Sequence, residues 1–186
     1  MNKEIETQIL DVDSKKIISK LRKLGAEEHL EVLQKRWVFN IKEGTKQAIS
    51  TGRWIRLRQV GKYNTITYKN KKGSGTSETE EIEVQVDNFD DAAKILKQIP
   101  GFSGIYYQEN KRKKFTFKDI EFTLDSWPMI PTYLEIEAKN EKKLKEGLKL
   151  LSLEGKDSGH IGTNAIYEKY GLHIHSYKEV KFGMKK

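Results

Sequence analysis

Like charges recur along this chain as pairs separated by one residue. The acidic pairs are Glu4 and Glu6, Glu81 and Glu83, and Glu135 and Glu137, and the basic pair is Arg56 and Arg58. Carboxylates bind hard divalent cations through oxygen, whereas arginines hold phosphate oxygens. Together, the two kinds of pair predict a site that binds a metal–polyphosphate complex.

The pairs lie in segments where polar and apolar residues alternate, which is typical of a β-strand. Side chains two positions apart on a strand share a face, so both members of a pair point the same way. The residues beside them, such as Ile55 and Leu57, form an apolar face on the other side. Like charges about 7 Å apart repel one another. Opposite charges on neighbouring strands of a solvated face would offset this repulsion, and so would charged ligands bound inside a barrel.

Three stretches with apolar residues at helical spacing predict helices that cover the apolar face. The first follows Asp13 and ends at Gly25, the second extends from Phe89 to Ile99, and the third begins at Asn140. A short fourth helix is expected from Thr163 to Tyr170. Strands dominate and short turns join most of them, so we expect an α+β fold with an antiparallel sheet. This sheet would curl into a barrel with its charged face inside and the helices outside.

The composition limits the class of protein. The 186 residues fit one domain or two small ones, and 35 basic against 27 acidic side chains leave a charge of +8, which favours an anionic partner. The absence of cysteine excludes disulfide scaffolds, thiol catalysis and cysteine-ligated metals. No apolar run reaches the roughly 20 residues that cross a bilayer, and no hydrophobic signal segment is found, so we expect a cytoplasmic protein without a membrane partner. No nucleic-acid partner is expected, because no helix-turn-helix, RNA-recognition or zinc-finger pattern is present.

The order and spacing of the charged motifs resemble the CYTH family, which includes class IV adenylyl cyclases and thiamine triphosphatases. The matching residues are Glu4-Ile5-Glu6, Arg56-Leu57-Arg58, Lys69, Glu81-Ile82-Glu83, Arg112, Leu124-Asp125 and Glu135-Ile136-Glu137. The resemblance implies a triphosphate tunnel, a closed or nearly closed antiparallel β-barrel of about eight strands with helices packed outside. It also implies that residues 1–186 form a single CYTH-like domain, which acts as a monomer or a homodimer.

The resemblance implies a role for each motif. Mg²⁺ or Mn²⁺ is expected at the carboxylates of Glu4, Glu6, Glu135 and Glu137. The triphosphate is expected to bind the cations Arg56, Arg58, Lys69 and Arg112. Catalytic roles, namely binding a second metal or placing a nucleophile, are expected for Asp125, Glu81 and Glu83. Two positions depart from the family pattern. Gln8 stands at the position of the signature lysine, and Asn110 stands at a position that is often lysine in the family.

The implied function is a metal-dependent enzyme that acts on a triphosphate. The main expectation is hydrolysis of inorganic or organic triphosphate, with inorganic triphosphate, ATP and thiamine triphosphate as candidate substrates. One alternative is a class IV adenylyl cyclase, which makes cyclic AMP and pyrophosphate from ATP. Another is a module that binds polyphosphate or nucleotide without turnover, which the two missing cations favour.

Overall fold

The computed structural model describes residues 5–42, 52–71 and 79–184. Its contacts divide the chain into two compact units. Within the described ranges, the first unit contains the chain up to Val32 and Lys111–Leu172, and the second contains Leu33–Asn110 and His173–Met184. The fold is α+β with a mostly antiparallel sheet, as the alternating segments predict. No described helix has the length and apolar character needed to span a membrane.

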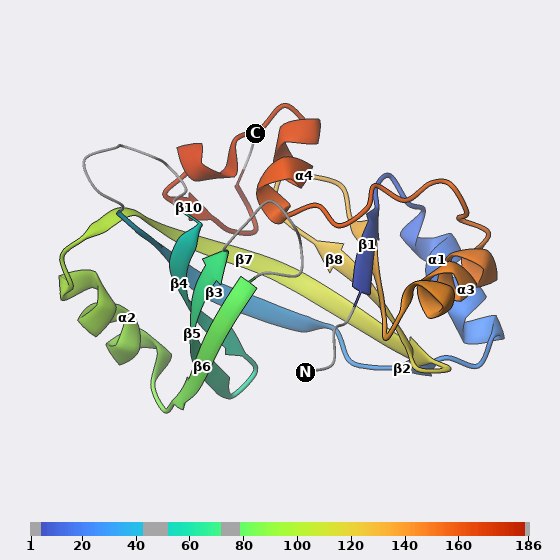
Figure 1. Ribbon diagram of the computed structural model, residues 1–186, viewed down its shortest axis with the longest axis horizontal. Helices are drawn as coiled ribbons and strands as arrows, with labels where there is room; N and C mark the ends of the chain where they lie inside the picture. The colour runs from blue at the N-terminus through green and yellow to red at the C-terminus, as the bar shows by residue number, and fades with distance from the viewer. Residues whose placement is uncertain (1–4, 43–51, 72–78, 185–186) are drawn as a thin grey trace. The chain divides into compact units, whose positions relative to one another are not determined.

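The first unit packs helices against the apolar face of its strands. Its strands are β1 (Ile5–Ile9), β2 (Glu27–Glu28), the end of β7 (Phe102–Phe117), β8 (Ile120–Ser126) and β9 (Tyr133–Ala138), and its helices are α1 (Ser14–Lys23), α3 (Glu141–Leu151) and α4 (Thr163–Lys169). Figure 1 shows α1 and α3 side by side, with α3 in contact with β1, β8 and β9. The buried core between them includes Leu21, Phe122, Leu134, Ile136 and Leu148.

The second unit repeats this arrangement with its own core. It contains nearly all of β3 (Val32–Ile41), then β4 (Arg53–Val60), β5 (Tyr63–Lys71), β6 (Thr79–Val86), α2 (Phe89–Gln98), the first part of β7, a 3-10 turn (Ile174–Ser176) and β10 (Glu179–Val180). Helix α2 contacts β4 (Figure 1). Its buried residues Phe89, Ala93 and Leu96 cluster with Phe39 and Leu57 from the apolar face of the sheet.

The helix boundaries follow local sequence signals. The side chains of Asp13, Asn88 and Asn140 accept hydrogen bonds from backbone N–H groups in the first turns of α1, α2 and α3. Gly147 brings α3 close to the sheet, because a Cβ atom there would lie 3.0 Å from Cγ2 of Ile136. The predicted helices are therefore confirmed, including the short α4.

The sheet differs from the expected barrel in one respect. Its strands pair in the order β1-β9-β8-β7-β3-β4-β5-β6, with β2 and β10 as short additions to β7. Strands β1 and β6 are the two ends of this path, and among the described residues no pairing joins them. The expected closed barrel is therefore only partly confirmed: the antiparallel strands and outer helices are present, but hydrogen bonds do not close the sheet. Alternation predicts the faces of strands and carries no signal for closure, because closure depends on which distant strands pair.

Candidate functional site

A cluster of carboxylates forms where the first strand meets the ninth. β1 and β9 pair antiparallel with Glu6 opposite Glu137 and Gln8 opposite Glu135. Residues in such register share a face of the sheet. One oxygen each from Glu6, Glu135 and Glu137 lie within 4.8 Å of one another. The structure thus brings together three of the four predicted metal ligands, and the fourth, Glu4, lies outside the described residues.

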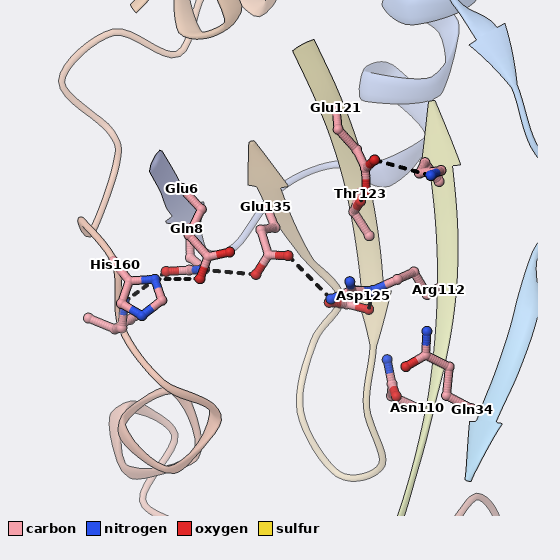
Figure 2. A network of polar contacts seen from close by, with 12 residues as sticks. Glu6, Gln8, Gln34, Asn110, Arg112, Glu121, Thr123, Asp125, Glu135 and His160 are labelled. Atoms are coloured by element: carbon pink, nitrogen blue, oxygen red, sulfur yellow. Dashed lines mark hydrogen bonds and ion pairs between the residues drawn. The ribbon is translucent and has the colours of Figure 1, made fainter. Parts of the chain in front are cut away.

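Glu135 is the centre of a line of polar contacts in this unit (Figure 2). Gln8 Nε2 donates a hydrogen bond of 2.9 Å to Glu135 Oε2, and Arg112 Nη2 donates one of 3.2 Å to Oε1. Arg112 also donates to both oxygens of Asp125, from Nε at 3.0 Å and from Nη2 at 2.5 Å. The predicted triphosphate ligand Arg112 and the predicted catalytic Asp125 therefore form a fork-like ion pair next to the carboxylate cluster.

Burial controls the charge of this network. It raises the pKa of Glu135 to about 7, and the negative charges of Glu6 and Asp125 raise this pKa further. The positive charge of Arg112 and the hydrogen bond from Gln8 lower the pKa, but they offset only part of the effect of burial. Burial alone would lower the pKa of Arg112, but the hydrogen bonds and charge of Asp125, together with Glu135, raise it. Arg112 is therefore held in its charged form.

The loop between α3 and α4 bonds to β1 next to the carboxylate cluster. The backbone N–H of Ser158 donates to Gln8 O at 2.8 Å, and the N–H of Gln8 donates to Gly159 O at 3.2 Å. The N–H of Ile161 donates to Gln8 Oε1 at 2.8 Å. These bonds place His160, whose Nδ1 makes a close contact with Glu6 Oε1. Sequence reasoning missed His160, since no periodic pattern links a residue in an irregular loop to a strand so far away in the chain.

The second unit carries three of the four predicted cations, Arg56, Arg58 and Lys69, on one face of its sheet. Arg56 lies opposite Thr67 in the β4–β5 register, and Thr67 in turn lies opposite Glu83 on β6. Thr67 Oγ1 donates to Glu83 Oε2 at 2.6 Å, and Nη2 of Arg56 and of Arg58 lie 3.9 and 4.0 Å from the same oxygen. One carboxylate thus faces two guanidinium groups.

Lys69 belongs to the same face. It lies opposite Glu81 and forms an ion pair with it. Burial lowers the pKa of Lys69, and the charges of Arg56 and Arg58 lower it further, while Glu81 opposes both effects. The predicted catalytic residues Glu81 and Glu83 therefore lie among the cations of their own unit.

A further arginine on this face was missed by sequence reasoning. Arg36 on β3 lies directly opposite Arg58 in the β3–β4 register. Its Nη2 donates to Gln34 Oε1 at 3.2 Å and makes a short contact with Asn110 Oδ1. Both amide residues are buried, and Figure 2 labels them. Lys35 and Arg36 are adjacent in the sequence and point to opposite faces of a strand. The sequence alone therefore left open which of the two shares a face with Arg58.

The arrangement of the motifs matches a known family. The model of the CYTH domain matches residues 2–161, from the segment before β1 to the loop bonded to Gln8. The chain belongs to the CYTH family. Members of this family act as triphosphatases or adenylyl cyclases, and the family is in general metal-dependent. Comparison with curated proteins gives no significant match.

Solved structures of low sequence identity share this CYTH fold. The PH1012 protein from Pyrococcus horikoshii has a TM-score of 0.66 at 20% identity, over 86% of this chain and 96% of its own. A candidate adenylate cyclase from Vibrio parahaemolyticus has a TM-score of 0.63 at 17% identity, over 89% and 97%. HpAC1 from Hippeastrum, described as having a dominant triphosphatase activity, has a TM-score of 0.57 at 14% identity, over 90% and 95%.

Proposed function

We propose that this CYTH protein hydrolyses a triphosphate that it binds as a complex with Mg²⁺ or Mn²⁺. The observation that carries the proposal is the carboxylate cluster of Glu6, Glu135 and Glu137, with oxygens within 4.8 Å of one another. Carboxylates this close repel one another, and a bound cation would offset that repulsion. The donor set consists of carboxylate oxygens, which are the ligands that Mg²⁺ and Mn²⁺ prefer.

The carboxylates of Glu6, Glu135 and Glu137 would hold the ion, and the predicted ligand Glu4, which lies outside the described residues, stays part of this proposal. When bound, the ion would neutralise phosphate oxygens and orient the substrate. The raised pKa of Glu135 means that this residue gives up a proton as the ion binds. Gln8 and Arg112 hold the two oxygens of Glu135 in place for this role.

The cations of the second unit are proposed to bind the phosphate groups. Arg56, Arg58 and Lys69 project from neighbouring positions on β4 and β5, and their charge outweighs that of Glu81 and Glu83. Transfer of a phosphoryl group depends mainly on positioning and on stabilising the charge of the equatorial oxygens. Fixed cations on a rigid sheet supply both.

The contacts of the three predicted catalytic residues favour a positioning role. Asp125 accepts two hydrogen bonds from Arg112 and is 1% exposed, so we assign it to orient that guanidinium. We assign Glu81 and Glu83 to pair with the cations while no substrate is bound, and so to reduce the repulsion among Lys69, Arg56 and Arg58. A largely dissociative transition state needs little proton abstraction from the attacking water, so hydrolysis does not require a dedicated base among these residues.

Cyclisation of ATP is the second candidate, and Trp54 is the observation that favours it. Trp54 shares the face of Arg56, and Lys69 Nζ lies 6.0 Å from the centre of its ring. An aromatic ring beside phosphate-binding cations is suited to stacking on a nucleotide base. Hydrolysis remains the first proposal because the carboxylates and cations suffice for it without recognition of a base. The Hippeastrum protein with the same fold is also described as having a dominant triphosphatase activity.

The deciding experiment is product analysis with the purified protein. Inorganic triphosphate and ATP are each incubated with Mg²⁺ or Mn²⁺, and phosphate, pyrophosphate and cyclic AMP are quantified. We expect phosphate from both substrates, and its loss in Glu137→Gln but not in the exposed control Glu154→Gln. Cyclic AMP with pyrophosphate would support the cyclase, and tight binding without any product would leave only a binding module.

A further inference from the structure

His160 touches the carboxylate cluster from a loop, and the proposed function gives it no role. Its Nδ1 makes a close contact with Oε1 of Glu6, which is one of the three clustered carboxylates. An ionised carboxylate can only accept hydrogen bonds, so Nδ1 carries the hydrogen of this contact. A carboxylate offers about four acceptor positions on its two oxygens. Glu6 can therefore accept from His160 and still bind a cation.

The backbone of the loop determines where His160 lies. Gly159, the residue before it, has a φ of 67°, a left-handed conformation that favours glycine. The N–H groups of Ser158 and Ile161 donate to the backbone and side-chain oxygens of Gln8, each at 2.8 Å. The position of His160 is therefore set by hydrogen bonds that do not involve its own side chain.

Gln8 connects this loop with a second carboxylate of the cluster. Its Oε1 accepts from the Ile161 N–H, while its Nε2 donates to Glu135 Oε2 at 2.9 Å. An amide side chain provides a donor and an acceptor together, whereas a lysine provides donors only. Figure 2 shows Glu6 and Gln8 between His160 and Glu135. A continuous series of contacts thus extends from the loop through β1 to β9.

We propose that His160 is a positioning residue for the metal, which holds the carboxylate of Glu6 in the orientation that the ion requires. This inference rests on the proposed function and adds a residue to it. A glutamate side chain loses rotamer freedom when it binds an ion, and a hydrogen bond made beforehand reduces that cost. Partners that hydrogen-bond to metal ligands orient them, and their removal typically weakens metal binding about tenfold to a hundredfold.

The test is the affinity of the metal-free protein for Mn²⁺, with the electron paramagnetic resonance signal of free Mn²⁺ as the readout of a titration. His160→Ala should weaken binding about tenfold to a hundredfold. His160→Asn should retain most of the affinity, because the amide nitrogen of asparagine can donate from the place of Nδ1. His173→Ala is the control, since it removes an exposed imidazole from the second unit.

A double-mutant cycle shows whether His160 acts through Glu6. Glu6→Ala removes the carboxylate that His160 contacts, so adding His160→Ala to it should change the Mn²⁺ affinity by less than about twofold. Hydrogen exchange at the Ile161 amide in EDTA should be unchanged in His160→Ala, because Gln8 accepts that hydrogen bond. Thermal unfolding in EDTA confirms that each variant is folded.

The outcomes separate the inference from the function on which it rests. If His160→Ala binds Mn²⁺ as tightly as His173→Ala while Glu6→Ala binds weakly, the positioning role is wrong and the proposed function stands. The role is also wrong if His160→Asn binds as weakly as His160→Ala, if the effects of His160→Ala and Glu6→Ala on the free energy of binding simply add, or if the Ile161 amide exchanges faster in His160→Ala. If the wild-type protein binds no Mn²⁺ with or without triphosphate, both the positioning role and the proposed function are overturned.

Discussion

Glu135 lies between partners that have opposite effects on its charge. Burial and the neighbouring carboxylates favour the protonated form, while Arg112 and Gln8 favour the ionised form. The balance leaves its pKa at about 7, which is well above the ordinary value of 4.5. A group whose pKa is higher in the folded state binds its proton more tightly there than in the unfolded chain.

This shift predicts how the stability of the metal-free protein depends on pH. The stabilisation from the protonated form is complete below about pH 4.5 and is lost as the pH rises through about 7. The loss amounts to at most about 3 kcal/mol. Urea unfolding in EDTA from pH 4.5 to 8 should show a steeper decline for the wild type than for Glu135→Gln. Parallel curves for the two proteins would contradict the shift.

Individual residues show where the sequence was informative. The face shared by Glu6 and Gln8, and that shared by Arg56 and Arg58, follow from strand parity alone, and the structure confirms both. The partners of these residues do not follow, because pairing between strands is non-local. Arg36 became recognisable only when the β3–β4 register placed it opposite Arg58.

Among the elements, helix α3 depends on the smallest residue at its contact with the sheet. A Cβ atom at Gly147 would lie 3.0 Å from Ile136 Cγ2 and 3.2 Å from Ile120 Cγ2. Interiors are close-packed, so added side-chain volume at this point forces the helix or the strands to move. Periodicity predicted the helix and its apolar stripe, but the spacing between helix and sheet has no counterpart in sequence.

Gly147→Leu should lower the free energy of unfolding by about 1–3 kcal/mol, the usual cost of overpacking. The exposed position Lys145 lies on the same helix, and Lys145→Leu should have little effect on the free energy of unfolding. Chemical denaturation of both variants measures the difference. Equal stability of the two variants would mean that α3 adjusts its distance from β8 and β9 without cost.

The loop from Ser158 to Ile161 is a second element, and Gln8 makes several of its bonds to β1. Gln8 bonds to it through its backbone N–H, its backbone carbonyl and its side-chain oxygen. Gln8→Lys restores the cation of the family signature but removes the acceptor for the Ile161 N–H. An unsatisfied buried donor costs about 1–3 kcal/mol.

We therefore expect Gln8→Lys to be less stable than the wild type, with faster hydrogen exchange at the Ile161 amide. The exchange should remain unchanged in Gln59→Lys, a substitution of the same kind on β4 in the second unit. Unaltered protection of Ile161 in Gln8→Lys would show that the backbone bonds hold the loop without the side chain.

At the scale of the whole molecule, the two units are continuous through their strands. β7 contributes its first residues to the second unit and its last residues to the first, with the boundary after Asn110. The expectation that residues 1–186 behave as a single domain stays a prediction. Because a strand that loses half of its partners rarely remains ordered, we expect both units to unfold together. Calorimetry should show one transition, with equal calorimetric and van't Hoff enthalpies, and two resolved transitions would contradict it.

A bound metal should stabilise the whole chain through the carboxylate cluster. At a Mn²⁺ concentration of a hundred times the dissociation constant, linkage predicts about 2.7 kcal/mol of added stability. The melting temperature should be higher in Mn²⁺ than in EDTA for the wild type and for the exposed control Glu154→Gln. The difference should be much smaller for Glu137→Gln. A shift of the same size in all three proteins would place the ion elsewhere.

The pairing of β1 with residues near the other end of the chain also matters during synthesis. Strand β1 bonds to β9 on one edge and to the segment around Ser158 and Gly159 on the other. Both neighbours are translated long after β1. At ribosomal rates this strand waits on the order of ten seconds before either partner emerges. An unpaired strand edge is prone to aggregate, and charged side chains are a common protection against it. Glu6, which later joins the carboxylate cluster, thus also helps to keep the nascent strand in solution until the chain that completes its sheet has been made.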